Sequence, residues 1–262
     1  MPITVFKNEK GRLVNKTIEL GLEHTTGLWT TLCVADINQD GYDDLLAGNW
    51  GGNAKLHASS LFPLKLYVGD FDNNGDVDQL LAVAGNNGYY PFLGKDELEK
   101  RLPSLIKKRY LTYASFAGQT VDYILEGKMN AVQTLKAETL ASVLLMNAAG
   151  KHFSMSKLPY QLQWAPVFSF ITGDFTDDGK TDIVAAGNFY GTVPYEGRYD
   201  AMLPLLLLQQ EKLHFTPIGP IQSGLETIAE ARDLKMIQLA GKRTAYLMAV
   251  NNGKIAVYEK RK

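Results

Sequence analysis

The sequence predicts an all-β protein built from about four repeated strand units, with one mostly helical insertion. Three observations predict this fold class. Short apolar runs of about four to eight residues alternate with turn-forming segments, as in strands that are buried on both faces. An acidic pattern occurs three times between such runs, and a hairpin-like pattern with a polar turn recurs as well. The sequence therefore favours many short strands in repeated arrangement.

The acidic pattern reads Asp-x-(Asp/Asn/Thr)-x-(Asp/Asn)-Gly-x-x-Asp in every copy. Its three copies span residues 36–44, 70–78 and 174–182. Apolar runs precede them at 29–35, 64–69 and 167–173, and others follow at 45–47, 80–84 and 183–186. We therefore expect each acidic segment to form a loop between two buried strands.

The hairpin pattern occurs at residues 5–13 and 144–153 and, more weakly, at 207–215. Gly11 precedes Asp36 by 25 residues, and Gly150 precedes Asp174 by 24. A similar strand pattern without the acids follows the weak hairpin at 231–250, which predicts a degenerate fourth unit. Because one strand-rich unit cannot bury its own faces, this repetition points to a propeller or a solenoid.

The stretch between the second and third acidic segments interrupts the repeat, because Asp70 and Asp174 are 104 residues apart. Leu98, Leu102 and neighbouring apolar residues recur there at helical spacing. We expect a mostly helical insertion over residues 95–140, including short helices at 121–125 and 132–140. Strand units with two acidic loops would then occupy residues 1–94, and strand units with the third loop residues 141–262. The basic residues of the insertion predict a solvated helix face or, alternatively, a partner-binding face.

The acidic segments have the composition of calcium-binding loops: oxygen ligands at positions one, three and five, glycine at six and a later carboxylate. They are not EF-hands, because position twelve is Ala47, Leu81 or Ala185 and the flanks are predicted strands. Oxygen donors without His or Cys favour Ca²⁺ over zinc or copper. Each loop is expected to bind through four side chains and, at position seven, one main-chain carbonyl. The expected ligands are Asp36, Asn38, Asp40, Tyr42 (carbonyl) and Asp44; Asp70, Asp72, Asn74, Asp76 (carbonyl) and Asp78; and Asp174, Thr176, Asp178, Lys180 (carbonyl) and Asp182. The alternative is that these segments are only Asp- and Gly-rich turns.

Calcium would affect both stability and location. A dissociation constant of about 10⁻⁴ M is typical of extracellular modules. At about 1 mM Ca²⁺ each such site adds roughly 1.4 kcal/mol to the free energy of unfolding. Sites of this affinity stay nearly empty at cytosolic calcium levels, so they favour an extracytoplasmic setting.

Charge and composition exclude some partners. The formal net charge is −1, so a broad basic surface for nucleic acid or anionic membranes is not expected. No apolar run approaches the roughly 20 residues of a membrane span, and the first residues lack a signal-peptide pattern. The single cysteine, Cys33, lies in an apolar run and is expected to be buried; it leaves no partner for a disulfide within the chain.

The residues give little support to catalysis. No nucleophile elbow, zinc-protease motif or phosphate-binding loop is present, although a pair of glycan-cleaving carboxylates remains an alternative. Loops after the predicted inner strands combine Asn with aromatic rings, a composition suited to stacking on sugars or anchoring a protein. These ligand-binding candidates are Trp50, Tyr89, Tyr90, Phe189 and Tyr190. The alternative is that the rings only pack between sheets.

The acidic loops and their flanking strands resemble the FG-GAP/VCBS repeat family, whose fold is the β-propeller of integrin α-subunit heads. More narrowly, segments 45–49, 67–72, 186–192 and 196–201 are similar to the C-terminal part of long VCBS-repeat proteins of Bacteroidetes-like bacteria. The resemblance implies propeller blades whose loops bind Ca²⁺ structurally, and an exported protein. Family propellers usually have seven blades, so four units would be an incomplete seven-bladed propeller or an open or small one.

The resemblance and the residues together predict a non-catalytic, calcium-stabilised module at the cell surface that recognises a protein or a glycan. The upstream part of a longer protein is a further expected partner. The alternative function is a polysaccharide-active enzyme that uses the propeller as a platform.

Overall fold

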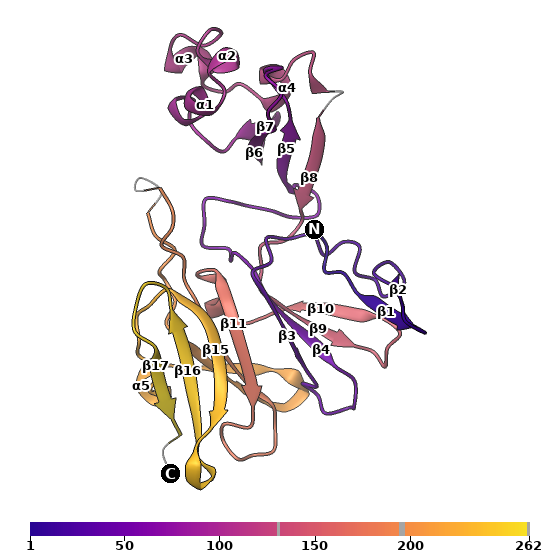
Figure 1. Cartoon of the computed structure of the whole chain (residues 1–262), viewed down its shortest axis with the longest axis vertical. Helices are drawn as coiled ribbons and strands as arrows, with labels where there is room; N and C mark the ends of the chain where they lie inside the picture. Colours follow the sequence, from indigo (N-terminus) through magenta and orange to yellow (C-terminus); the bar gives the residue numbers. More distant parts are fainter. Residues whose placement is uncertain (130–131, 194–196, 261–262) are drawn as a thin grey trace. The chain divides into compact units, whose positions relative to one another are not determined.

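A computed structural model describes residues 1–129, 132–193 and 197–260. The chain divides into two compact units. Unit 1 comprises residues 1–3, 24–27 and 56–139, and unit 2 comprises residues 4–23, 28–55 and 140–262. The predicted boundary between residues 94 and 95 does not coincide with this division, because the helices share unit 1 with the second acidic loop. Strands predominate over helices in the described residues as a whole (Figure 1), so the predicted all-β class with a small helical part is confirmed.

Unit 2 contains three antiparallel sheets and a separate hairpin. The hairpin consists of β1 (Phe6–Glu9) and β2 (Arg12–Asn15). Sheet I contains β3 (Thr31–Ala35), β4 (Asp44–Gly48), β9 (Val143–Asn147) and β10 (Phe153–Lys157); sheet II contains β11 (Val167–Gly173), β12 (Asp182–Gly187), β13 (Leu205–Gln209) and β14 (Phe215–Ile218); sheet III contains β15 (Ala231–Gln238), β16 (Thr244–Val250) and β17 (Ala256–Glu259). In each sheet the strands pair in chain order, and β11 packs beside both β3 and β15 (Figure 1).

Short helices connect these strands: η2 (Tyr160–Gln163), η4 (Glu211–Leu213), α5 (Pro220–Ser223) and η5 (Ala240–Lys242). Sheet III is the predicted unit without acids, and it has three strands where sheets I and II have four. Its second strand still continues into an Asn-Gly turn, at Asn252 and Gly253. The strands of the repeat therefore persist after the acidic residues are lost.

Apolar side chains from facing sheets form the core of unit 2. Leu46 of sheet I packs with Phe170 and Ile183 of sheet II, and Ile171 of sheet II packs in a second cluster with Met248 of sheet III. Every residue of β12 is buried, since sheet II lies between the other two sheets. This explains why the strand sequences are continuously apolar and do not alternate.

Unit 1 has its own sheet of β5 (Leu64–Gly69), β6 (Asp78–Gly85), β7 (Gly88–Pro91) and β8 (Gln133–Ala137), in the order β7-β6-β5-β8. Helices α1 (Lys95–Arg101), α2 (Pro103–Ile106), α3 (Tyr113–Phe116) and α4 (Val121–Ile124) join β7 to β8. The core of unit 1 contains Leu98, Leu102 and Ile106, which recur at helical spacing. They are buried together with Tyr67 of β5 and Phe71 of the second acidic loop.

The expected helix at residues 132–140 is wrong. Residues 133–137 form β8, which pairs antiparallel with β5 from Leu64↔Ala137 to Val68↔Gln133. The main chain of residues 133–137 is extended because it forms hydrogen bonds with the edge of β5. A tertiary contact of this kind overrides local helix propensity. In the described part of the chain, no helix is sufficiently long and apolar to cross a membrane.

Candidate metal and ligand sites

The three acidic loops have the same main-chain conformation. The fourth residue of each loop has a positive φ, at 60° for Gln39, 59° for Asn73 and 62° for Asp177. The glycine at position six also has a positive φ, between 82° and 90°, where a side chain would be strained. The first aspartate then accepts the N–H of this glycine, at 2.9 Å in Asp36–Gly41, 2.9 Å in Asp70–Gly75 and 2.8 Å in Asp174–Gly179.

The aspartate at position nine closes each loop. In the first loop, Asp44 Oδ2 accepts the Ile37 N–H at 3.0 Å, and in the other two Asp78 and Asp182 accept the equivalent N–H of Phe71 and Phe175. In sheets I and II the third strand contributes a further donor. The Asn147 N–H lies 2.7 Å from Asp44 Oδ1, and the Gln209 N–H lies 2.9 Å from Asp182 Oδ1.

Burial and hydrogen bonds change the acidity of these groups in opposite directions. Burial raises the pKa of the closing carboxyls Asp44, Asp78 and Asp182. The Gly75 and Gly179 N–H groups lower the pKa of Asp70 and Asp174, which are the first aspartates of their loops. A closing carboxylate therefore lies in surroundings that favour a bound proton or a bound cation as its neutralising partner.

The second loop fits a cation best. Oxygen atoms of Asp70, Asp72 and Asp78 all lie within 4.8 Å of one another, and no other three acidic, His or Cys side chains of the described residues come this close. Asp72 Oδ2 accepts a hydrogen bond from Ser104 of α2 at 2.8 Å. Asp72 Oδ1 is buried without a hydrogen-bond partner, and a buried orphan oxygen of this kind is costly unless a cation or water satisfies it.

The structure brings the first and third loops together in unit 2 and places the second in unit 1. Gln39 Nε2 donates to the Gly179 carbonyl at 2.7 Å. Within the first loop the Asn38 amide donates to Asp40 Oδ2 at 2.9 Å, and in the third Thr176 Oγ1 lies 3.5 Å from Asp182 Oδ2. The residue at position seven also has one role in all three: the N–H groups of Tyr42, Asp76 and Lys180 donate to the side chains of Asp40, Asn74 and Asp178.

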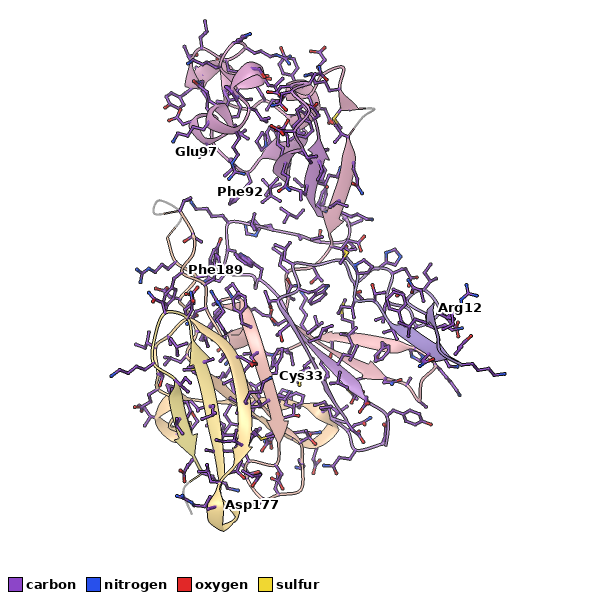
Figure 2. The ribbon with its side chains drawn as sticks, in the orientation of Figure 1. Arg12, Cys33, Phe92, Glu97, Asp177 and Phe189 are labelled. Atoms are coloured by element: carbon purple, nitrogen blue, oxygen red, sulfur yellow. The ribbon has the colours of Figure 1, made fainter. Side chains whose placement is uncertain are left out.

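The aromatic candidates of unit 2 pack against one another. The Trp50 ring lies 5.2 Å from the rings of both Phe189 and Tyr199, and Phe189 (labelled in Figure 2) lies 6.3 Å from Phe168. Trp50 Nε1 is buried without a hydrogen-bond partner. Tyr190 has the Arg198 guanidinium 5.0 Å from its ring centre.

In unit 1, Tyr89 and Tyr90 lie on β7 and are half-buried. The Lys65 ammonium lies 3.7 Å from the centre of the Tyr89 ring. These two residues therefore belong to a different unit from Trp50, Phe189 and Tyr190.

Sequence reasoning missed an ion pair with a buried carboxylate, near Tyr190 in unit 2. Glu230 is 5% exposed, and it pairs with Arg232 and accepts the Tyr190 N–H at 2.8 Å. Burial alone would raise the pKa of Glu230, but hydrogen bonds from Tyr190 and Asn251 and the charge of Arg232 hold it below the usual range. The Arg232 guanidinium also lies 4.2 Å from the Phe168 ring centre. No local pattern in the sequence indicates such a pair.

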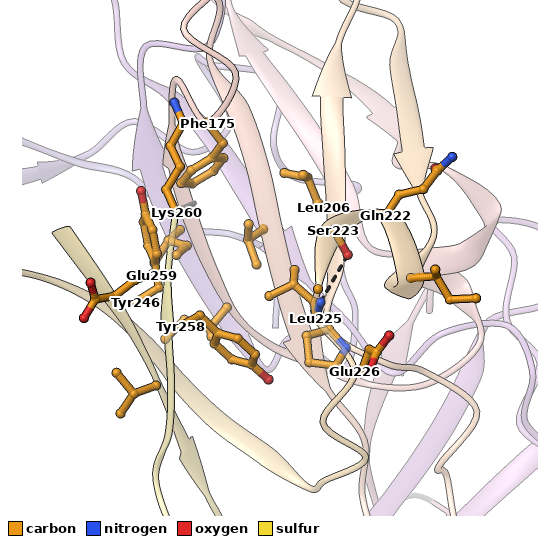
Figure 3. Close-up of a pocket in the computed structure, with 17 residues that line it drawn as sticks. Phe175, Leu206, Gln222, Ser223, Leu225, Glu226, Tyr246, Tyr258, Glu259 and Lys260 are labelled. Atoms are coloured by element: carbon orange, nitrogen blue, oxygen red, sulfur yellow. Dashed lines mark hydrogen bonds between the residues drawn. The ribbon is translucent and has the colours of Figure 1, made fainter. Parts of the chain in front are cut away.

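The sequence also did not predict two grooves of unit 2. One lies between sheets II and III beside the third loop, and apolar and aromatic side chains including Phe175, Tyr246 and Tyr258 line it (Figure 3). The other is shallow and is lined by Asn53 and Gln163 together with Tyr160 and Trp164. The last two rings are 67% and 40% exposed and lie 5.4 Å apart, which is an arrangement suited to stacking on a flat ligand.

Residues 28–61 match the family model of the FG-GAP repeat. The match covers β3, the first acidic loop and β4, and it suggests a β-propeller-like module. No curated protein and no solved structure is significantly similar to the chain.

Proposed function

We propose that this protein is a non-catalytic recognition module of the β-propeller type, stabilised by Ca²⁺ in its acidic loops, that binds a protein or a glycan outside the cytoplasm. One observation carries the metal part of this proposal: carboxylate oxygens of Asp70, Asp72 and Asp78 lie within 4.8 Å of one another, and Asp72 Oδ1 is buried without a hydrogen-bond partner. The shared conformation of the other two loops extends the inference to Asp36–Asp44 and Asp174–Asp182.

Asp70, Asp72, Asn74 and Asp78 would hold the ion in unit 1, together with the main-chain carbonyl of Asp76. Bound Ca²⁺ would supply positive charge that offsets the repulsion between carboxylates and would tie two strands together. The chain itself supplies the preformed turn, because the first aspartate is already held by the glycine N–H in each loop. The FG-GAP match supports the non-catalytic part of the proposal, since such repeats are typically non-catalytic.

The metal is tested by thermal unfolding of EDTA-treated protein with Ca²⁺ or Mg²⁺ added. We expect about 1 mM Ca²⁺, but not Mg²⁺, to raise the midpoint of unfolding by several degrees. Asp72→Asn should abolish the share that comes from unit 1. Asp76→Asn is the matched control, because it removes the same charge from the same loop but keeps the carbonyl ligand. An equal response of both variants to Ca²⁺ would contradict the proposed ligand set.

The recognition role rests on the aromatic residues at the loop end of unit 2. The half-buried Tyr190 and the exposed rings of Tyr160 and Trp164 offer stacking faces, and Asn53 and Gln163 offer amide groups beside them. This composition suits sugar rings, which present apolar faces edged with hydroxyl groups. Similarity to long exported VCBS-repeat proteins would agree with this role and remains part of the proposal.

A glycan array probed in Ca²⁺ and in EDTA tests this role. We expect binding that Trp164→Ala reduces about fivefold, since stacking on one ring contributes on the order of 1 kcal/mol. Phe62→Ala is the control, because Phe62 is 60% exposed but belongs to unit 1. Hydrolysis of a bound glycan would instead identify the protein as an enzyme.

A further inference from the structure

The hairpin β1–β2 repeats the outer half of sheet I. In β1, Asn8 Oδ1 accepts the Gly11 N–H at 2.8 Å, and in β9 Asn147 Oδ1 accepts the Gly150 N–H at 2.8 Å. The residue before each glycine, Lys10 or Ala149, has φ of 53° in both turns. By this correspondence β1 is equivalent to β9, which is the third strand of sheet I, and β2 to its fourth.

The equivalent strands have an inner neighbour that β1 lacks. β9 pairs with β4, and β13 of sheet II pairs with β12, whereas within the described residues β1 pairs only with β2. All four residues of β1 are exposed. An isolated two-stranded hairpin is marginally stable in water, and an unpaired edge is a ready template for a further strand.

One face of β3 in sheet I is also exposed. Leu32 and Phe170 are equivalent, because each stands four residues before the first aspartate of an acidic loop. Phe170 is 5% exposed and packs in the cluster between sheets I and II, but Leu32 is 52% exposed and its neighbour Val34 is 59% exposed. Sheet I covers the face of sheet II that contains Phe170, and no sheet of the described residues covers Leu32 in the same way.

We propose that β1–β2 is the outer half of a fourth sheet of unit 2, whose inner half is an antiparallel strand pair in the same polypeptide, ahead of Met1. The chain order supports this source, because β4 precedes β9 and β12 precedes β13 in the complete sheets. The second strand of the missing pair would add to the edge of β1. Its first strand would cover Leu32 and Val34.

The repeat also defines the chemistry of the missing pair. The N–H of Asn147 caps the closing Asp44, and that of Gln209 caps Asp182. Asn8 occupies the equivalent place on β1, so the missing strands should be joined by another acidic loop whose final aspartate accepts the Asn8 N–H. The strand after this loop should be apolar and end in glycine, as do β4 and β12. This inference concerns strand pairing and does not depend on whether the loops bind calcium.

The test supplies a surrogate strand pair. A copy of residues 167–187, which form β11, the third loop and β12, is fused ahead of Met1 through a flexible linker of about 17 residues, the length that separates Gly187 from Leu205. Hydrogen exchange of residues 5–9 and 31–35 is compared between the fusion and the 262-residue chain. We expect the amides of residues 5–9 to exchange at least about tenfold more slowly in the fusion, since strand pairing protects them. Those of residues 31–35 should also exchange more slowly, because the added sheet buries the exposed face of β3.

A fusion in which the copied Val184 is replaced by proline is the control. Proline removes a ladder hydrogen bond from the copied strand, so the exchange rates should return to those of the 262-residue chain. Unchanged rates in the first fusion would overturn the proposal. A dimer of the 262-residue chain that the Leu32→Asp substitution dissociates would also overturn the proposal, because a second copy of the chain would then cover the exposed face of β3.

Discussion

The Asn147 N–H lies 2.7 Å from Asp44 Oδ1, so the third strand of sheet I holds the carboxylate that closes the first acidic loop. Gln209 and Asp182 have the same relationship in sheet II. The loops are therefore fixed at both ends: the first aspartate binds the turn, and the last binds a neighbouring strand. This arrangement links the conformation of an acidic loop directly to the integrity of a sheet.

Removing that carboxylate should destabilise unit 2. Asp44 is fully buried and accepts the N–H groups of Ile37 and Asn147. Asp44→Ala leaves both donors buried without a partner, so we expect a loss of about 2–4 kcal/mol in the free energy of unfolding. Urea unfolding in EDTA measures it. Asp43→Ala, at an exposed neighbouring position, should change stability by less than about 0.5 kcal/mol; equal effects would contradict this account.

The glycine at the end of β12 should tolerate no side chain. A Cβ at Gly187 would lie 1.8 Å from the Pro166 carbonyl oxygen, and one at Gly48 would lie 2.5 Å from that of Val167. Gly187→Ala should therefore cost about 1–3 kcal/mol or more through overpacking. Gly52→Ala is the control, because no atom lies within 4 Å of its Cβ position. Thermal unfolding compares the two variants, and similar midpoints would refute the prediction.

The ion pair near the aromatic cluster should depend on its arginine. Arg232→Ala would leave the buried Glu230 carboxylate with hydrogen bonds from Tyr190 and Asn251 but without its cation, so we expect a loss of about 1–3 kcal/mol. Arg232→Lys should recover part of it, because the charge returns but the planar stack on Phe168 does not. Guanidinium unfolding measures both variants. A loss no larger than that of Arg243→Ala, an exposed arginine paired with Glu259, would argue against this role.

Calcium binding should strengthen as the pH rises through the folded pKa values of the closing aspartates. Burial raises the pKa of Asp44 and Asp182 above 3.8, so between 3.8 and the raised values these carboxyls hold protons in the native, metal-free protein. Protons compete with Ca²⁺ for the same oxygens. Calorimetric titration at several pH values should show tighter binding and fewer released protons at higher pH.

The same shifts have the opposite effect on stability without metal. Because the native protein binds more protons than the unfolded chain in that window, the contribution of these two groups to stability falls as the pH rises through it. Urea unfolding of EDTA-treated protein compared with the Asp44→Asn/Asp182→Asn variant isolates this contribution. A contribution that increases with pH in this window would contradict the assigned burial effect.

The single thiol offers a further test of packing. Cys33 faces sheet II from β3 and is labelled in Figure 2. Burial raises the pKa of its thiol, so its reaction with a disulfide reagent at pH 8 should be at least about tenfold slower than in urea. Leu32→Cys in a Cys33→Ala background should react quickly, because position 32 is 52% exposed. If Cys33 in the folded protein reacts as quickly as the cysteine of Leu32→Cys, Cys33 does not face a packed sheet.

The repeated parts of the structure were predictable because their local chemistry repeats. Asp-rich loops with a glycine at position six, and the apolar strands around them, indicate the strand–loop–strand units that the structure contains. The division into units was not predictable, because the segment around Asp70 has the same acidic pattern as that around Asp36 but folds with the helices of unit 1. Strand β8 was missed for a similar reason: its pairing with β5 involves residues about 70 positions away.

The side-chain sites were predictable only in part. The spacing of Asp70, Asp72 and Asp78 predicts that they converge, since a nine-residue loop brings its ends together. The contact between Gln39 and Gly179, and the pair of Glu230 with Arg232, arise from packing between sheets. A single sequence has no signal for such contacts.

The position of unit 1 has a consequence for the order of folding. The largest segment of unit 1, residues 56–139, lies in the sequence between β4 and β9, whose pairing joins Leu45 to Leu145 across 100 residues. Closing a disordered loop of this length is slow and costs entropy. If unit 1 folds first, it shortens the effective loop between β4 and β9. The 2.7 Å hydrogen bond from the Gly51 N–H to the Leu140 carbonyl then joins the segment that follows β4 to the segment that precedes β9. We therefore expect unit 1 to fold first and sheet I to form late, with the first acidic loop among the last parts to become rigid.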